Sequence, residues 1–355
     1  MTYPYLTIDL EKIEHNARTI VRLCADHGIE VTGVTKVTCG SPQIARAMIR
    51  GGVGSIADSR FENIRRLREA GIEVPLMLLR LPPLTGVSEA VAGAQLSLNS
   101  EAVVIRALSD AAMARGLVHD VMLMVDLGDL REGIWPDDLP AVVEEVIGCP
   151  GIRFVSLGTN LACFGGVVPT EETMNRLVTL ADEIEVIFDI RFKWLSGINS
   201  SGLELIAAGR MPERINHARI GEAILLGRET TRRRPWPDTF QDAFQLHGEI
   251  LELKRKPSVP LGERSEDAFG QTPSFEQRGT VLRALVNIGR EDADIDGLVC
   301  RNPGMRILGA SSGYLVVDVT AAQRETGLGD ELVFDLNYSA LLAAMTSEYV
   351  KKRFV

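Results

Sequence analysis

The chain has 355 residues, of which 45% are hydrophobic and 24% charged, and acidic side chains outnumber basic ones by 48 to 38. A chain of this length can bury a full hydrophobic core and is expected to form two domains. The net charge of −10 gives no basis for nonspecific attraction to nucleic acid or to an anionic membrane surface, so we expect neither as a partner.

The opening residues, MTYPYLTIDL, contain no basic segment followed by a long apolar run, and no stretch has the length of a membrane span. We therefore expect a cytoplasmic protein. The five cysteines are scattered and show no CxxC spacing, which argues against a disulfide framework and against a structural zinc site.

Short β-branched runs alternate with longer amphipathic segments from residue 10 to about residue 230. The predicted strands are residues 29–36, 54–58, 74–80, 95–99, 121–126, 153–159, 191–196 and 216–221. Helix candidates such as PQIARAMIRGG and RFENIRRLREAG lie between them, with apolar positions three and four apart. Because no GxGxxG follows the first strand, eight such units favour an α/β fold of the (β/α)8 TIM barrel type over an open doubly wound sheet.

The pattern changes at RRRPWPD, near residue 231, and a polar stretch with Pro and Gly covers residues 254–279. Strand-like runs then follow: TVLRALVNIG, MRILGASSGYLVVDVT and DELVFDL. We predict a barrel domain over residues 9–230 and a mainly β domain over residues 231–355 together with residues 1–8.

Polar residues at the ends of the predicted strands indicate a site, because the chemistry of a TIM barrel lies at this face. Lys36 ends the first strand. The loops after the seventh and eighth strands carry Asn199, Ser200, Gly221 and Glu222, whose hydroxyl and backbone N–H groups suit a phosphate dianion. The alternatives are a lysine that extends its ammonium group to solvent, and ordinary turn residues.

Two arginines accompany these residues. Arg219 precedes Gly221 and can donate hydrogen bonds into the mouth of the barrel, and Arg131 in DLGDLREG can bind a carboxylate through two N–H groups. A surface position is the alternative for Arg131. A lysine, a phosphate cradle and a partner for a ring nitrogen together indicate pyridoxal 5′-phosphate as the cofactor.

The chain resembles the alanine racemase family of pyridoxal-phosphate enzymes, fold type III, and within it the ornithine racemase branch. The resemblance covers nearly the whole chain, and its specificity comes from the order and spacing of several motifs. These are YLTIDLEKIEHNA, GVTKVTCG, IADSRFENIRRL, DLGDLREG, LGTNLACFGG, GINSSGL, ARIGEAILLG, ILGASSGYLVVDVT and LNYSALLAAMTS.

The resemblance implies a role for each matched residue. Lys36 matches the lysine that binds the cofactor aldehyde and serves as one racemisation base, and Arg219 matches the arginine that faces the pyridine nitrogen. Arg131 matches the arginine near the cofactor O3′ and the substrate carboxylate. Asn160 stands where alanine racemases carry a histidine packed on the ring. The phosphate cradle is matched by Asn199, Ser200, Gly221 and Glu222.

The chain departs from the family at both tyrosines that alanine racemases use. The tyrosine four residues after the lysine is replaced by Gly40, and the second catalytic base, the tyrosine of an IGYxDG motif, is replaced by Arg290. Arginine is too basic to exchange protons readily at neutral pH. Tyr314 is our first candidate for the second base, although relatives of the ornithine racemase branch tend to have Asp-His at positions 313 and 314. The alternative is a tyrosine packed in the β-domain core.

Cys163 and Asp292 are lesser candidates for the second base, and a one-base reaction is a further possibility. The resemblance implies a small-molecule amino acid substrate, with ornithine or lysine suggested by the branch, and a head-to-tail homodimer that builds each site from two chains.

Two other functions are weighed against a racemase. A pyridoxal-phosphate homeostasis protein usually consists of the barrel alone, whereas about 120 further residues follow here. Fold-type III decarboxylases carry a CESGD-like segment and metal-dependent aldolases a His and Cys metal pair, and we find neither in the sequence.

Overall fold

The computed structural model describes residues 3–355, which form two compact units. The larger unit is Leu10–Gln241, and the smaller one contains Asp242–Val355 together with strand β1 (Tyr5–Ile8). The smaller unit is therefore discontinuous in sequence, since the barrel is inserted after its first strand.

The first unit extends beyond the boundary expected at residue 230. Asn16 on helix α1 (Leu10–Ala25) is fully buried, and its amide donates to the Phe240 carbonyl (2.8 Å) and accepts from the Phe240 N–H (2.7 Å). These contacts hold residues 231–241 against the barrel, so the compact unit ends after them.

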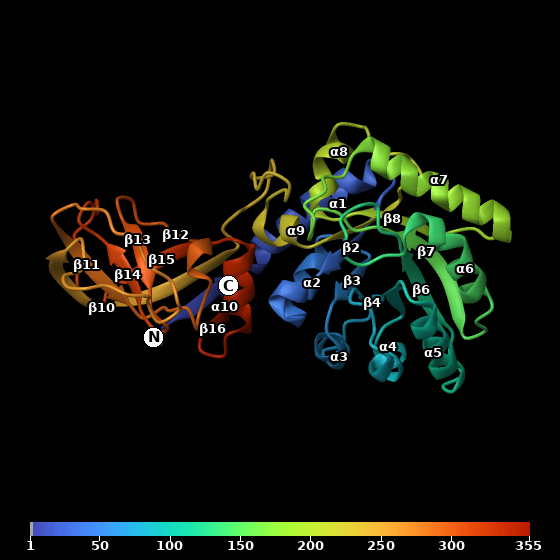
Figure 1. Cartoon of the computed structure of the whole chain (residues 1–355), viewed down its shortest axis with the longest axis horizontal. Helices are drawn as coiled ribbons and strands as arrows, with labels where there is room; N and C mark the ends of the chain where they lie inside the picture. The colour runs from blue at the N-terminus through green and yellow to red at the C-terminus, as the bar shows by residue number, and fades with distance from the viewer. Residues whose placement is uncertain (1–2) are drawn as a thin grey trace. The chain divides into compact units, whose positions relative to one another are not determined.

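The first unit is a closed parallel barrel of eight strands surrounded by helices (Figure 1). The strands, in barrel order, are β2 (Glu30–Val34), β3 (Ser55–Asp58), β4 (Leu76–Leu78), β5 (Leu96–Asn99), β6 (His119–Met124), β7 (Ile152–Gly158), β8 (Trp194–Ile198) and β9 (His217–Ile220). The barrel closes where β2 pairs with β9, from Glu30 opposite His217 to Gly33 opposite Ile220. All eight predicted strands are present, which confirms the TIM barrel.

One helix follows each barrel strand. They are α2 (Pro42–Arg50), α3 (Phe61–Glu69), α4 (Val87–Gly93), α5 (Ala102–Met113), α6 (Leu139–Ile147), α7 (Glu171–Phe188), α8 (Leu203–Ala207) and α9 (Glu222–Leu226). The first residues of two of these helices are capped by neighbouring side chains. Helix α2 has Pro42 at its first position after Ser41, whose hydroxyl accepts from the Ile44 N–H, and α7 begins with a capping box between Thr170 and Thr173.

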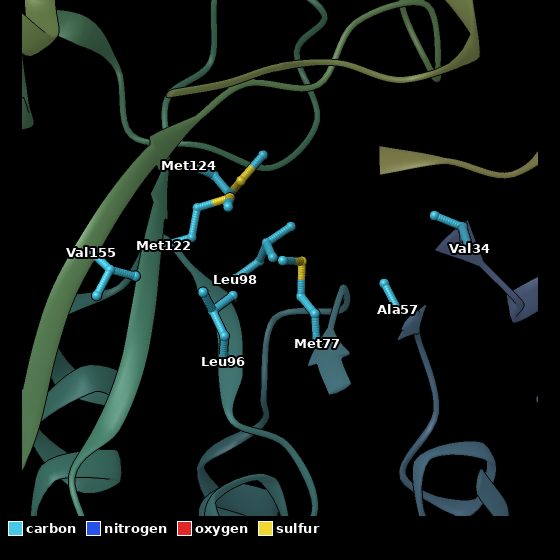
Figure 2. Close-up of a cluster of buried hydrophobic side chains, with 8 residues drawn as sticks. All are labelled: Val34, Ala57, Met77, Leu96, Leu98, Met122, Met124 and Val155. Carbon is cyan, nitrogen blue, oxygen red and sulfur yellow. The ribbon is translucent and has the colours of Figure 1, made fainter. Parts of the chain in front are cut away.

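Apolar side chains from strands β2 to β7 converge inside the barrel (Figure 2). This cluster is made of Val34, Ala57, Met77, Leu96, Leu98, Met122, Met124 and Val155. Strands β8 and β9 contribute polar side chains instead, because Ser196, His217 and Arg219 are all buried there. The interior therefore has an apolar part and a polar part, and the polar part lies beside two of the predicted site loops.

Two strand boundaries differ from the predicted ones for reasons visible in the structure. Strand β2 ends at Val34, so Lys36 belongs to the following turn and does not end the strand. Strand β8 begins at Trp194 instead of residue 191, because the Phe192 N–H donates to the Glu185 carboxylate of α7 (2.8 Å) instead of joining the sheet.

The second unit is built on an antiparallel sheet whose main path runs β12-β15-β10-β11-β14-β13, and β1 pairs with β10 on one side and with β16 on the other. Its elements are β10 (Phe244–Pro257), β11 (Thr280–Val286), β12 (Leu298–Cys300), β13 (Arg306–Ala310), β14 (Leu315–Asp318), β15 (Glu331–Leu336), α10 (Tyr338–Thr346) and β16 (Lys351–Phe354). The predicted mainly β domain is confirmed. Strand β10 extends to Pro257, four residues into the stretch expected to be irregular.

No helix in residues 3–355 combines the length and the apolar character that a membrane crossing requires.

Candidate functional site at the mouth of the barrel

Lys36 begins a short 3₁₀ turn, Lys36–Thr38, and its side chain is exposed. The preceding Thr35 is buried and donates from Oγ1 to the Asp58 carboxylate at the end of β3 (2.8 Å). Asp58 also accepts from Nδ2 of Asn63 (2.9 Å) and from two backbone N–H groups that follow it (2.7 and 3.1 Å). Burial raises the pKa of Asp58, and these hydrogen bonds oppose the rise. The turn is thus tied to β3, while the lysine amine stays accessible.

Gly40 ends this turn in the left-handed region, with φ of +61°. A Cβ atom at this position would lie 2.7 Å from Cβ of Asn63, whose side chain binds Asp58. No side chain fits here without displacing α3. The backbone around Lys36 therefore accounts for the glycine at the position where the resembled enzymes carry a tyrosine.

The loop after β6 folds back on the strand that it leaves. Asp126 accepts from the N–H groups of Gly128 (2.8 Å) and Leu130 (3.2 Å), and Gly133, at φ of +145°, packs so closely that an added Cβ would lie 2.4 Å from the Asp126 nitrogen. The fold-back sets Arg131 and Glu132 in place. Nε of Arg131 is 2.8 Å from Oε2 of Glu132.

A chain of polar contacts joins the loops after β6, β7 and β8. Nδ2 of Asn160 donates to Oε1 of Glu132 (3.2 Å), and Oδ1 of Asn160 accepts from Nδ2 of Asn199 (3.0 Å). Asn199 also accepts the Ser201 N–H (2.8 Å), and the Cys163 thiol contacts Oδ1 of Asn160 (3.5 Å). The structure therefore brings the predicted residues Arg131, Asn160 and Asn199 together, with Glu132 as the link between the first two.

Arg219 lies on β9 and is 5% exposed. Its Nη2 donates to the Thr159 carbonyl (2.7 Å), and its Nη1 donates to the carbonyl (3.2 Å) and the hydroxyl of Ser196. Burial lowers the pKa of Arg219 to about 10, and the charge of Glu132 is the largest influence against that shift. Arg219 is thus a buried cation held by Thr159, which follows β7, and by Ser196 on β8.

The predicted phosphate cradle is assembled from two neighbouring turns. Asn199 caps the 3₁₀ turn Ser200–Gly202, and the Ser200 hydroxyl accepts the Ala223 N–H of α9 (3.1 Å). Gly221 precedes α9, and a Cβ there would lie 3.1 Å from Cβ of Val34. The N–H groups of a first helical turn have no partner within the helix and can bind an anion.

Glu222 opens α9 and pairs with Arg233 (2.7 Å). Burial raises the pKa of Glu222, and the charges of Arg233, Arg228 and Lys36 oppose this rise. Burial likewise raises the pKa of Glu132, against the charges of Arg131, Arg219 and Lys36. Lys36 therefore acts electrostatically on both carboxylates, one in the loop after β6 and one at the cradle. The lysine charge is therefore felt at both groups of predicted residues.

In the second unit, Tyr314 lies in the loop between β13 and β14 and its side chain is 50% exposed. The alternative of a core tyrosine is therefore wrong. This loop packs on the loop that contains Arg290: the Arg290 N–H donates to the Ser311 carbonyl (3.0 Å) and the Glu291 N–H to the Ser312 carbonyl (3.1 Å). Tyr314 and the position of the missing family tyrosine thus belong to two adjoining loops.

Asp292 and Cys163, the two lesser candidates for the second catalytic base, differ in their exposure to solvent. Asp292 is 4% exposed and accepts the Gly289 N–H (2.8 Å), which makes it part of the turn that carries Arg290. Cys163 is exposed and lies within the polar chain at the barrel mouth, next to Asn160 and Asn199.

The family model for the N-terminal domain of alanine racemase matches residues 8–229. This chain belongs to the alanine racemase family. Ornithine racemase of Acetoanaerobium sticklandii is 40% identical over 354 residues, which cover 99% of this chain and 100% of the relative. Lysine racemase of Thermotoga maritima is 40% identical over 352 residues, which cover 99% of this chain and 98% of the relative. The resemblance seen in the sequence is confirmed, including the ornithine racemase branch.

The fold is also that of alanine racemases of known structure. The crystal structure of alanine racemase from Bartonella henselae with covalently bound pyridoxal phosphate has a TM-score of 0.77 to this chain, and the match covers 100% of both chains at 17% sequence identity. At this identity the likeness establishes the architecture, a barrel followed by a β domain.

The sequence does not single out Glu132 and Ser201, although both adjoin family motifs. Glu132 directly follows Arg131, but a neighbouring acid and base in a loop are usually solvated, and the contact with Asn160 comes from another loop. The Ser201 hydroxyl is buried without a hydrogen-bond partner in residues 3–355. Its sequence signal is the pair of serines in GINSSG, of which only Ser200 is among the predicted cradle residues.

Proposed function

We propose that this chain is a pyridoxal 5′-phosphate-dependent racemase that interconverts the L and D forms of an amino acid of the ornithine or lysine type. The observation that carries the proposal is the 40% identity, over nearly the full length of both units, to an ornithine racemase and a lysine racemase. A barrel-only cofactor carrier would not require a match through the β domain.

The barrel mouth suits this cofactor. Two buried hydroxyls at the site, Oγ of Ser201 and Oγ1 of Thr159, have no hydrogen-bond partner among the described residues. A buried hydroxyl without a partner is costly, so such groups favour a polar ligand. The phosphate would be held by Asn199, Ser200 and Ser201 with the backbone of Gly221 and Glu222, the ring nitrogen would face Arg219, and Lys36 would provide the amine for covalent attachment.

When bound, the cofactor supplies an electron-withdrawing conjugated ring that acidifies the Cα proton of an attached amino acid. In our proposal Arg131 binds the α-carboxylate through two N–H groups and so fixes the orientation of Cα. Lys36 moves a proton at Cα on one face through Nζ. Arg219 keeps the ring nitrogen unprotonated, because a cation disfavours a second positive charge beside it.

Inversion needs a second proton-transfer group on the opposite face of Cα. We propose the phenol of Tyr314 from the second copy of a head-to-tail homodimer. Two properties support this choice: the side chain is half exposed, and its loop adjoins the loop of Arg290, the position at which the family carries its catalytic tyrosine.

The experiment that tests the function is chiral chromatography of amino acids incubated with the purified protein and added cofactor. We expect L-ornithine or L-lysine, and equally the D form, to give a mixture of both enantiomers. Release of carbon dioxide or of an aldehyde without enantiomer interconversion would instead assign a decarboxylase or an aldolase.

A variant defines the role of the lysine. Lys36→Ala is expected to lose racemisation by a factor of about 10³ or more, since both covalent attachment and one proton-transfer group are removed. Turnover close to that of the unchanged protein would refute the assignment of Lys36.

A further inference from the structure

Glu132 has no role in the function proposed above, yet it contacts two of the predicted site residues, Arg131 and Asn160. Its side chain is only 14% exposed, whereas the Arg131 side chain beside it is 40% exposed. A carboxylate is seldom buried unless its oxygens are bound, and here both are: Oε2 by Nε of Arg131 (2.8 Å) and Oε1 by Nδ2 of Asn160 (3.2 Å).

The contact is made at Nε of Arg131, which leaves the edge formed by Nη1 and Nη2 for an end-on carboxylate. A guanidinium group has five N–H donors, and with Nε occupied the Nη1 and Nη2 groups still form an edge for two-pronged binding. Within residues 3–355 no hydrogen bond engages these two groups of Arg131, and the ion pair with Glu132 has its contact at Nε. Glu132 therefore restricts the orientation of the arginine without competing for its binding edge.

The contact with Asn160 fixes the position of Glu132 itself. Asn160 belongs to the loop after β7 and is held by Asn199 of the loop after β8 (3.0 Å). An ion pair between sequence neighbours on an exposed loop usually contributes little. This pair differs, because its carboxylate is buried and is tied to two further loops of the barrel mouth.

The negative charge of Glu132 also interacts with the cations of the site. The charges of Arg131, Arg219 and Lys36 act on Glu132, and Glu132 in turn acts on Arg219. Its charge offsets part of the cost of burying Arg219, which has only carbonyl and hydroxyl oxygens and a methionine sulfur as direct partners among residues 3–355.

We propose that Glu132 is a positioning residue for Arg131: it binds Nε, aims the two Nη groups at the α-carboxylate of the substrate, and links this arginine to Asn160. The proposal rests on the function assigned above, and it makes Glu132 a determinant of affinity for amino acids as carboxylates.

The test compares Glu132→Gln, Arg131→Lys and the double variant with the unchanged protein. Glutamine keeps the size of the side chain and removes its charge. We expect Glu132→Gln to raise KM for the amino acid about tenfold with a smaller change in kcat, because the ion pair that orients the binding group is lost. The effects of the two single changes should not add in the double variant, since Glu132 acts through Arg131.

A ligand comparison separates positioning from general damage to the site. The decarboxylated amine of the same substrate lacks the α-carboxylate, so its binding, followed by the change in cofactor absorbance, should be equal in Glu132→Gln and in the unchanged protein. Glu145→Gln is the matched control, because Glu145 is half exposed and pairs with Arg106 on the helices around the barrel. It should match the unchanged protein in every assay.

The outcomes are distinguishable. Racemisation by the unchanged protein together with an unaltered KM in Glu132→Gln would overturn this proposal and leave the function standing. Equal weakening of the amino acid and the amine, or additive effects in the double variant, would also overturn it. Failure of the unchanged protein to racemise any amino acid would refute the function itself.

Discussion

At the scale of single residues, Gly40 shows how the backbone around Lys36 fixes its sequence. Its φ of +61° and the 2.7 Å that would separate an added Cβ from Cβ of Asn63 are two separate penalties for any side chain. We predict that Gly40→Ala lowers the free energy of unfolding by about 2–4 kcal/mol, from the left-handed backbone and from overpacking together.

The matched control is Gly71→Ala. Gly71 has a similar φ of +75°, but nothing lies within 4 Å of an added Cβ. The free energy of unfolding of Gly71→Ala should therefore fall only by the cost of the left-handed backbone, about 1 kcal/mol. Denaturant unfolding of the two variants checks the prediction, and equal losses would show that the contact with Asn63 costs nothing.

Two buried histidines in the barrel wall predict a pH dependence of stability. Burial lowers the pKa of His119 to about 4 and that of His217 to about 3, and both rings bind serine hydroxyls (2.8 and 2.7 Å). In the unfolded chain these rings take up protons below a pH of about 6.5, whereas in the fold they stay neutral. Their contribution to stability is therefore complete above pH 6.5 and is lost as the pH falls toward the folded pKa values.

We predict that the free energy of unfolding decreases between pH 6.5 and 4.5 by up to about 1.4 kcal/mol per pH unit for each histidine. The His119→Asn variant should show a shallower decrease, measured by urea unfolding at a series of pH values. A slope identical to that of the unchanged protein would contradict this origin of the pH dependence.

At the scale of elements, Asp129 joins two loops of the barrel mouth. It is 1% exposed, and its carboxylate accepts the N–H groups of Phe164 (2.8 Å), Val167 (3.2 Å) and Cys163 (3.2 Å) from the loop after β7. Burial alone would raise the pKa of Asp129, but these backbone donors outweigh it and lower the pKa. Asp129 is thus ionised and holds the loop that also carries Asn160.

We predict that Asp129→Ala frees this loop, because three N–H groups lose their acceptor at once. Amide hydrogen exchange of residues 161–168 should become faster, by a factor of about 10 or more, while exchange in the strand β5 remains unchanged. Protection equal to that of the unchanged protein would show that the loop is held by other contacts.

The elements also show how far the sequence predicts this structure. Hydrophobic periodicity identifies all eight barrel strands, because strands buried on both faces read as short apolar runs. It does not give their ends, because those depend on distant contacts such as the Phe192 N–H on Glu185. The site residues likewise divide into those that local sequence indicates and those that depend on distant contacts. Lys36 and Arg219 could be placed from strand order, whereas the surroundings of Glu132 depend on Asn160, which comes from the loop after the next strand.

At the scale of the whole molecule, the proposal of a shared site predicts complementation between inactive variants. Lys36→Ala and Tyr314→Phe would each be inactive in racemisation, because each removes one proton-transfer group from every site. In a head-to-tail dimer, a mixed pair has one site with both changes and one with neither. An equimolar mixture after subunit exchange should recover about a quarter of the full activity.

Native mass spectrometry of the same mixture confirms that mixed dimers have formed. Mixed dimers without recovered activity would place the second proton-transfer group elsewhere, for instance at the exposed Cys163 within the barrel mouth.

The proposed function depends on covalent binding of pyridoxal 5′-phosphate to Lys36, at the mouth of the barrel. The most direct measurement is borohydride reduction of the protein incubated with the cofactor, followed by peptide mass mapping. We predict one stable pyridoxyl adduct, located on Lys36. An unmodified Lys36 peptide, or an adduct on another lysine, would rule out Lys36 as the residue that binds the cofactor.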